Sequence, residues 1–267
     1  MRHIMFRSFL ALLVVVVTGL GVPAHAEDEA LALMRKGDAW HRLPQERVRS
    51  RLMLQDQGGA QRMRQVEFIT LDGEGRGDRL RVRFLQPADV KGTTLLSLQA
   101  PDANGGDDQW LYLPSFRKTR RVGQAELGDR FVGTDLFFED LKRREVEDYR
   151  YRMLGSEAVD GQDCYLIEAT PSAPQVVKES PYGKTHLWLR KDNLFTVRVR
   201  AFDRKLQPLK EMRMGQIRKV AGAAWRADET TVIDVQRKHR TVLTVDQRQT
   251  EFTLAPDTFS QHAMSGE

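Results

Sequence analysis

The sequence predicts a mainly β protein built on one large antiparallel sheet, with two helical segments available to cover it. From Pro44 onward, apolar and polar residues alternate with a period of two, which is typical of strands buried on one face. Short turn signals such as Asp72-Gly73 and Asp160-Gly161 separate the alternating runs. Connections this short predict antiparallel neighbours, because parallel strands require long crossovers.

The first 26 residues have the layout of a secretory signal peptide. Arg2 and Arg7 flank the start of a short apolar run, and Ala24-His25-Ala26 has the small-x-small pattern of a cleavage site. The run is too short, and too interrupted by glycine and proline, to make a good membrane span. We expect cleavage after Ala26, with an uncleaved anchor as the alternative. No cysteine lies at the cleavage site, so the exported chain is expected to be soluble and free of a lipid anchor.

Residues 27–267 are expected to form a single domain, since neither a low-complexity linker nor a block of like charge divides them. Removing Arg2 and Arg7 leaves 42 − 2 = 40 basic residues against 37 acidic ones, a net charge near +3. Export makes nucleic acid an unexpected partner, whereas weak attraction to an anionic membrane surface stays open. Cys164 is the only cysteine and lies in a strand-like run, which favours a buried hydrophobe over a reactive thiol.

Two segments are expected to be helical. Residues 27–43 place Leu31, Met34 and Trp40 on one side, with acidic residues first and basic residues after them. In residues 132–144, either Thr134 or Asp135 is positioned to cap a short helix. The apolar residues that this second helix would carry are Leu136, Phe137 and Leu141.

The strands are expected in the alternating runs, several of which carry arginines on one face and apolar residues on the other. One face of the sheet is therefore expected to be wet, and a sheet this large must curl or pack on the helices to cover its apolar face. The expected strands span 64–71, 80–85, 93–99, 109–113, 148–153, 163–170, 185–190, 195–202, 209–217, 227–235 and 240–247.

The stretch QWLYLPSFRKTRRV, residues 109–122, departs from this alternation. Its strand is apolar on both faces, which predicts a central strand whose Trp110 and Tyr112 are either simply buried or face a ligand. The following cations, Arg117, Lys118, Arg120 and Arg121, have three interpretations. They form a solvated loop edge, they pair with the carboxylates of residues 135–140, or they flank a cavity and face phosphate groups or an acidic partner.

No enzyme, metal or cofactor is expected. The histidines of the exported chain are scattered and lack metal-ligand spacing, and no nucleophile motif or phosphate-binding loop occurs. Glu139 and Asp140 are adjacent, so on a helix they would point about 100° apart and would not share a site.

Three motifs carry a resemblance to a known family. WLYLPSFRKTRRV, then GTDLFFEDL ten residues later, and finally FTLAPDTFS at 252–260 resemble the outer membrane lipoprotein-sorting proteins, relatives of the LolA and LolB carriers that often occur beside RND-type exporters. The resemblance covers most of residues 27–267. It implies a strongly curved antiparallel sheet that forms a half-open, unclosed β-barrel, with helices covering its concave side.

The resemblance further implies a periplasmic carrier or chaperone that holds a lipid or acylated lipoprotein in an apolar cavity. A possible RND-family exporter and peripheral membrane contact follow as partners. The candidate lipid-binding residues are Trp110, Tyr112, Phe131, Leu136 and Phe137, and the candidate rim or partner-binding residues are Arg117, Arg120 and Arg121. The alternatives are an RseB-like sensing module that binds a membrane protein, and a structural envelope component with a filled core.

Overall fold

The computed structural model describes residues 24–73, 77–101 and 106–266, so the signal peptide predicted for residues 1–26 lies outside it except for the last three residues. Thirteen strands make up one sheet. They are β1 (Gln45–Gln55), β2 (Gln61–Leu71), β3 (Arg79–Gln86), β4 (Thr94–Leu98), β5 (Asp108–Leu113), β6 (Lys118–Arg121), β7 (Tyr149–Val159), β8 (Gln162–Pro171), β9 (Tyr182–Arg190), β10 (Thr196–Asp203), β11 (Pro208–Ala221), β12 (Ala224–Asp234) and β13 (His239–Gln249).

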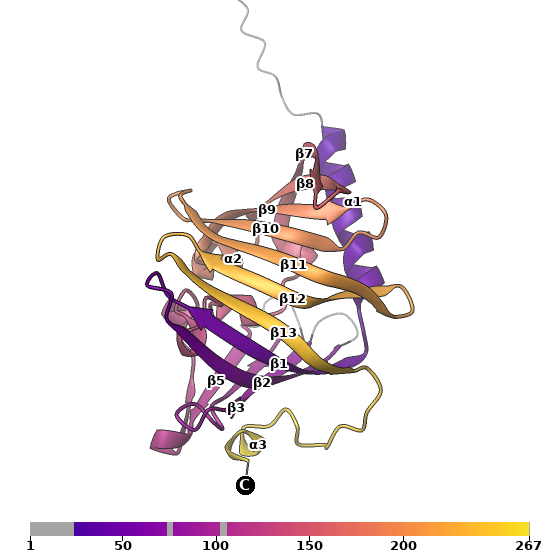
Figure 1. Cartoon of the computed structure of the whole chain (residues 1–267). Helices are drawn as coiled ribbons and strands as arrows, with labels where there is room; N and C mark the ends of the chain where they lie inside the picture. Colours follow the sequence, from indigo (N-terminus) through magenta and orange to yellow (C-terminus); the bar gives the residue numbers. More distant parts are fainter. Residues whose placement is uncertain (1–23, 74–76, 102–105, 267) are drawn as a thin grey trace, which may run out of the picture.

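The sheet consists of two antiparallel meanders, β1–β6 and β7–β13, joined where β1 pairs with β13. This junction pairs Leu54 with Thr241 and Arg47 with Gln249. The two edge strands, β6 and β7, do not pair with each other, so the curved sheet stays open (Figure 1). The predicted fold class, a half-open antiparallel barrel, is confirmed.

The N-terminal helix α1 (Ala24–His41) lies beside the second meander and contacts β7 and β12 (Figure 1). Ala30 is fully buried there, and Leu31 and Met34 pack against the same apolar cluster. The prediction for Trp40 is wrong, because this side chain is 38% exposed and stacks under Lys36. The remaining α-helices are the short α2 (Pro174–Glu179) and α3 (His262–Ser265).

A connection that we call the plug segment, residues 122–148, runs from edge strand β6 to the opposite edge strand β7. Because its ends lie at opposite edges, it must cross the whole sheet, and its apolar side chains pack inside the curve. The α-helix predicted for residues 132–144 is wrong. The structure has 3-10 turns η2 (Gln124–Glu126), η3 (Phe131–Gly133), η4 (Glu139–Leu141) and η5 (Val146–Asp148) instead, in addition to η1 (Pro114–Phe116) before β6.

The outer face of the first meander is covered by the C-terminal tail, residues 250–266. Thr258 accepts a hydrogen bond from Arg81 of β3 (3.3 Å), and Met264 of α3 is fully buried. Strand β5 is next to the edge and not central as predicted. The plug segment lies on the inner face of β5, which accounts for the apolar residues on that face. The C-terminal tail covers the outer face of the neighbouring strands.

Candidate ligand-binding hollow

A buried lysine fastens the middle of the plug segment to the second meander. Lys210 of β11 is 1% exposed and forms an ion pair with Asp140, which also accepts a hydrogen bond from the Tyr182 hydroxyl (2.6 Å). The Lys210 ammonium lies 3.5 Å from the centroid of the Phe137 ring. Burial lowers the pKa of Lys210, an effect that Asp140 opposes, and burial raises the pKa of Tyr182. A buried charge of this kind is tolerated only while its partner stays in place.

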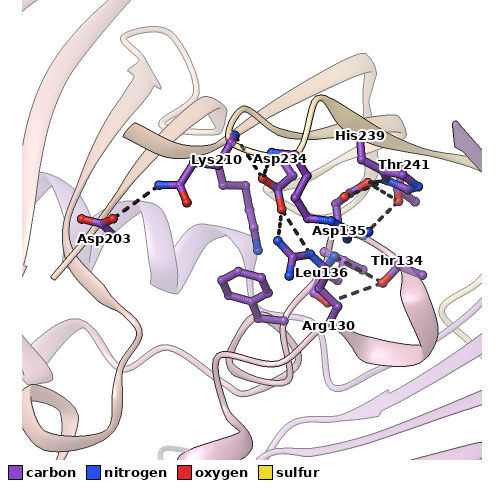
Figure 2. Close-up of polar contacts among 12 residues, drawn as sticks. Arg130, Thr134, Asp135, Leu136, Asp203, Lys210, Asp234, His239 and Thr241 are labelled. Carbon is purple, nitrogen blue, oxygen red and sulfur yellow. Dashed lines mark hydrogen bonds and ion pairs between the residues drawn. The ribbon is translucent and has the colours of Figure 1, made fainter. Parts of the chain in front are cut away.

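A second set of polar contacts fixes the preceding turn (Figure 2). Asp135 is fully buried, and its carboxylate accepts hydrogen bonds from the Thr241 hydroxyl (2.7 Å) and lies 2.7 Å from His239 Nδ1. Arg130 forms an ion pair with the buried Asp234. Asp135 therefore binds β13 and does not cap a helix, which explains why the predicted helix does not form.

Between these anchors, aromatic side chains of the plug segment fill the concave side of the first meander. Phe131 is 2% exposed, and its ring centroid lies 5.5 Å from that of Phe84 and 5.7 Å from that of Phe138. The other buried members of this cluster come from both the strands and the plug segment: Leu52, Leu54, Val66, Val82, Val90, Leu95, Leu111, Val122, Leu127 and Leu141. This half of the hollow is a packed core.

The second meander differs, because α1 leaves a cavity of about 320 Å³ between itself and the sheet. We call this space the helix cavity. Its apolar wall is formed by Met34, Tyr151, Leu189, Leu194, Phe195 and Met214. Asp38, His41 and Arg144 supply its polar groups. A cavity that is largely apolar with a few polar groups at its boundary is the usual form of a small-molecule site.

Two further cavities, of about 240 and 200 Å³, lie on either side of residues 139–145. We call them the plug cavities. Both are lined by charged side chains, including Asp140, Lys142 and Arg143. Arg144 lines the smaller plug cavity and the helix cavity, so the two spaces meet at this residue.

The five predicted lipid-binding residues are not brought together. Trp110 pairs with Leu96 across the sheet, whereas Leu111 on the opposite face joins the core that holds Phe131. Because side chains alternate along a strand, Trp110 and Tyr112 lie on the outer face. Phe131 and Phe137 are buried in the plug segment, and Leu136 is half-buried beside them. None of the five lines the helix cavity or the plug cavities, and their binding of lipid stays a prediction.

The predicted rim arginines lie at the open edge of the first meander, far along the sheet order from the helix cavity. Arg120 forms an ion pair with Glu126 (2.8 Å), and Arg121 pairs with Asp108. Arg117 is exposed and adopts a left-handed backbone conformation with φ of 47°. The suggested pairing of these cations with Asp135, Glu139 and Asp140 is wrong, because those carboxylates are bound by other groups.

The sequence did not identify the residues that line the helix cavity, except that Met34 was predicted to lie on the apolar side of the N-terminal helix. Leu189 and Met214 belong to alternating strands, in which nothing distinguishes a cavity wall from a packed core. Arg144 lies in the run LKRRE, which has the composition of an ordinary solvated segment. The signal that identifies these residues is the position of α1 over β7–β11, which is a long-range property.

The candidate reactive groups noted in the sequence lie in the described part of the chain. Residues 24–73, 77–101 and 106–266 contain no group of three potential metal ligands, and no helix among them is long and apolar enough to cross a membrane. Cys164 is fully buried, and burial raises the pKa of its thiol. His186 is held beside Glu168 (3.1 Å) as a strand residue with a satisfied polar partner.

Comparison with known proteins agrees with this architecture. A family model described as an uncharacterized protein matches residues 77–266. A domain from Vibrio parahaemolyticus described as an outer membrane lipoprotein-sorting protein has a TM-score of 0.83 at 26% identity, covering 90% of this chain and 99% of that one. A DUF1329 family protein from Desulfovibrio piger gives the same values. No curated protein matches the sequence.

A more distant structure, a LolA superfamily protein from Nitrosomonas europaea, shares the fold with a TM-score of 0.67 at 19% identity. It covers 87% of this chain, and the match spans 98% of its own length. The open sheet and its inner covering segments therefore define a LolA-like half-open barrel. The chain belongs to the family whose model matches residues 77–266, and its structural neighbours are an outer membrane lipoprotein-sorting domain and a DUF1329 protein, in agreement with the predicted LolA-like resemblance.

Proposed function

We propose that the protein is a non-enzymatic carrier of the bacterial cell envelope that binds the hydrocarbon chain of a lipid or acylated protein. The observation that carries this proposal is the apolar helix cavity of about 320 Å³ between α1 and the sheet. A similar protein described as a lipoprotein-sorting domain, at 26% identity over 90% of this chain, supports a role in handling acylated molecules.

The energetics of such a carrier need only an apolar space. Each methylene removed from water contributes ~0.8 kcal/mol, so ten buried methylenes contribute on the order of 8 kcal/mol. The ligand enters by displacement of α1, which is held to the plug segment mainly through polar contacts at its surface. Arg35 binds Glu147 (2.7 Å) with both side chains more than half exposed, and Asp38 binds Arg143. Exposed ion pairs contribute little to stability, so the main cost of moving this helix is the exposure of its apolar face around Ala30 and Met34.

The proposal is tested by purifying the protein without detergent and identifying extracted lipids by mass spectrometry. Binding of a fluorescent fatty acid is then compared between the wild type and Met214→Trp, which places a bulky ring in the helix cavity. We expect at least a tenfold weaker affinity in this variant, equivalent to about 1.4 kcal/mol. Val177→Trp, on the exposed surface of α2, is the matched control. A protein that is empty and binds no fatty acid favours an interaction module over a carrier.

We further propose that Arg117, Arg120 and Arg121 contact the acidic surface of a membrane or of an RND-family exporter. Arg117 and Arg121 are exposed at the edge of the sheet, next to Phe116, whose side chain is 68% exposed. Charge reversal of Arg120 and Arg121 should weaken binding to anionic vesicles and reduce its dependence on salt. An unchanged salt dependence would identify these arginines as ordinary solvated residues.

A further inference from the structure

Three consecutive cations, Lys142, Arg143 and Arg144, enter the hollow from the plug segment, and they differ in their partners. The first two are surrounded by carboxylates. Lys142 lies within ion-pair distance of Asp107, Glu139 and Glu179, and Arg143 lies within ion-pair distance of Asp38, Asp78 and Glu145. Among the described residues, Arg144 forms no ion pair with a carboxylate. Its charge is nevertheless felt by Glu139 in the same cavity, because Arg144 opposes the rise that burial causes in the Glu139 pKa.

The groups in direct contact with Arg144 are neutral. Its guanidinium donates a hydrogen bond to the Thr185 hydroxyl (3.1 Å) and lies 3.8 Å from the centroid of the Tyr149 ring. Its Nε is buried and has no hydrogen-bond acceptor. Burial raises the pKa of Tyr151 to about 12, although Arg144 opposes this change, so the phenol beside Arg144 stays uncharged at neutral pH. Burial also raises the pKa of Tyr149.

Several acidic residues of the same cavities are bound by other cations. Asp38, in the helix cavity, is paired with Arg143 and lies 3.7 Å from Arg42. In the smaller plug cavity, Asp140 is bound by Lys210, and Glu145 lies 3.6 Å from Arg143. An anionic group that enters near Arg144 would meet a guanidinium whose Nε has no acceptor. It would share the smaller plug cavity with Glu139, whose Oε2 also has no hydrogen-bond partner and whose pKa is raised by burial.

From this geometry we infer that the ligand is an anionic amphiphile, whose hydrocarbon chain occupies the helix cavity and whose carboxylate or phosphate head binds Arg144. Arg144 lines both the apolar helix cavity and the smaller plug cavity, where charged side chains are mixed with apolar ones, so one side chain lies between the two spaces that such a molecule would straddle. A guanidinium matches both carboxylate and phosphate oxygens with paired donors. The inference rests on the proposed function, since it specifies the ligand of the same cavity.

The test uses three ligands with the same chain length, which separates the head group from the tail. Palmitate, hexadecyl phosphate and uncharged hexadecanol are titrated into the full chain below their critical micelle concentrations, with isothermal calorimetry or displacement of a fluorescent fatty acid as readout. We expect both anions to bind about tenfold tighter than the alcohol, because a charge-assisted hydrogen bond is exchanged for a neutral contact.

The variant Arg144→Met keeps the length of the side chain but removes the charge. It should lose the preference for the anions while its affinity for hexadecanol stays within about threefold of the wild type. Arg150→Met, at an exposed position on strand β7, is the matched control and should keep the preference. Circular dichroism confirms folding, and Arg144→Gln replaces the methionine variant if that protein does not fold.

The outcomes separate this inference from the function on which it rests. Equal binding of the three ligands to the wild type would overturn the inference but leave the carrier intact. An equal loss of affinity for all three ligands in Arg144→Met would also overturn it, because Arg144 would then shape the cavity without distinguishing charged from uncharged head groups. If the wild type binds none of the ligands, the proposed carrier function fails and the inference fails with it.

Discussion

Strands β1–β6 and strands β7–β11 belong to one sheet, but the segments that cover them leave very different amounts of free space. The first region is filled by Phe131, Phe138 and Leu141 of the plug segment, which pack against fully buried strand residues. The second region is covered by α1, which leaves a cavity of about 320 Å³ lined largely by apolar side chains. A single curved sheet therefore holds a permanent core at one end and a candidate binding site at the other.

The difference follows from how each covering segment is held. The plug segment is tied to the sheet at both of its ends and by buried polar groups in between, including Asp135 and Asp140. Helix α1 packs apolar residues such as Ala30 and Met34 on the sheet, but its polar contacts with the plug segment are exposed or half-exposed ion pairs. Buried charges without their partners are costly, whereas exposed pairs break easily. We therefore expect α1 to act as the movable cover and the plug segment as a fixed one.

The largest expected effect is the loss of a plug aromatic. Phe131→Ala removes a ring that is 2% exposed and should lower the free energy of unfolding by about 4 kcal/mol, because a cavity forms in a packed core. Urea denaturation followed by circular dichroism measures this change. The control, Phe116→Ala, alters a ring that is 68% exposed and should change the value by less than about 0.5 kcal/mol. Similar small losses in both variants would mean that the plug segment is loosely packed.

The next prediction concerns the buried anchor. Lys210→Met leaves Asp140 without its cation and should cost about 3 kcal/mol of unfolding free energy. The double variant Lys210→Met/Asp140→Asn should recover part of that loss, since it removes the unpaired charge as well. Lys205→Met, at an exposed position in the turn before β11, serves as the control. No recovery in the double variant would show that the packing of Lys210, and not its charge, matters.

Much of this architecture was predictable from local pattern, and the exceptions have a common cause. Alternation in the runs of β3, β8 and β10 identifies strands directly, because one face of each is buried. Residues 132–144 look helical because their apolar spacing and the cap candidates Thr134 and Asp135 are local signals. Asp135 is instead bound by Thr241, a residue 106 positions away, which no local pattern reveals.

The candidate site was less predictable for the same reason. The double-sided apolar strand containing Trp110 was predicted to be central, with Trp110 and Tyr112 either simply buried or facing a ligand. The plug segment covers its inner face, and the C-terminal tail packs over the strands beside it. Conversely, Leu189 and Met214 alternate like any half-buried strand residue, and only the placement of α1 turns them into a cavity wall. Periodicity indicates which face of a strand is buried, but it does not identify what buries that face.

A matched pair of substitutions compares the two regions directly. Val66→Leu adds a methylene to the filled core, where Val66 is fully buried, and should cost about 2 kcal/mol through overpacking. Val146→Leu adds the same group at the helix cavity and should change the unfolding free energy by less than about 0.5 kcal/mol, because free space accepts it. Both values come from urea denaturation under the same conditions. Equal costs at the two positions would contradict the difference in packing between the regions.

The smallest expected effect is a pH dependence confined to the region covered by α1. His41 lies at the end of α1, and its Nδ1 accepts a hydrogen bond from the Trp225 backbone amide (3.2 Å). Burial lowers the pKa of His41, with Arg226 acting in the same direction and the Leu194 carbonyl opposing it. Because the folded-state pKa lies below the unfolded value of about 6.5, the stabilisation is present above that value and is lost as the pH falls through the folded pKa.

Relative to His41→Gln, the wild type should therefore lose unfolding free energy as the pH falls from 7 to 5. The control is His262→Gln, since His262 lies exposed at the start of α3 and should leave the pH dependence of the wild type unchanged. Identical pH slopes for the wild type and His41→Gln would show that the end of α1 does not respond to acid. A steeper slope in the wild type alone would localise the acid-sensitive contact to the cover of the helix cavity, while the aromatic core beneath the plug segment stays intact.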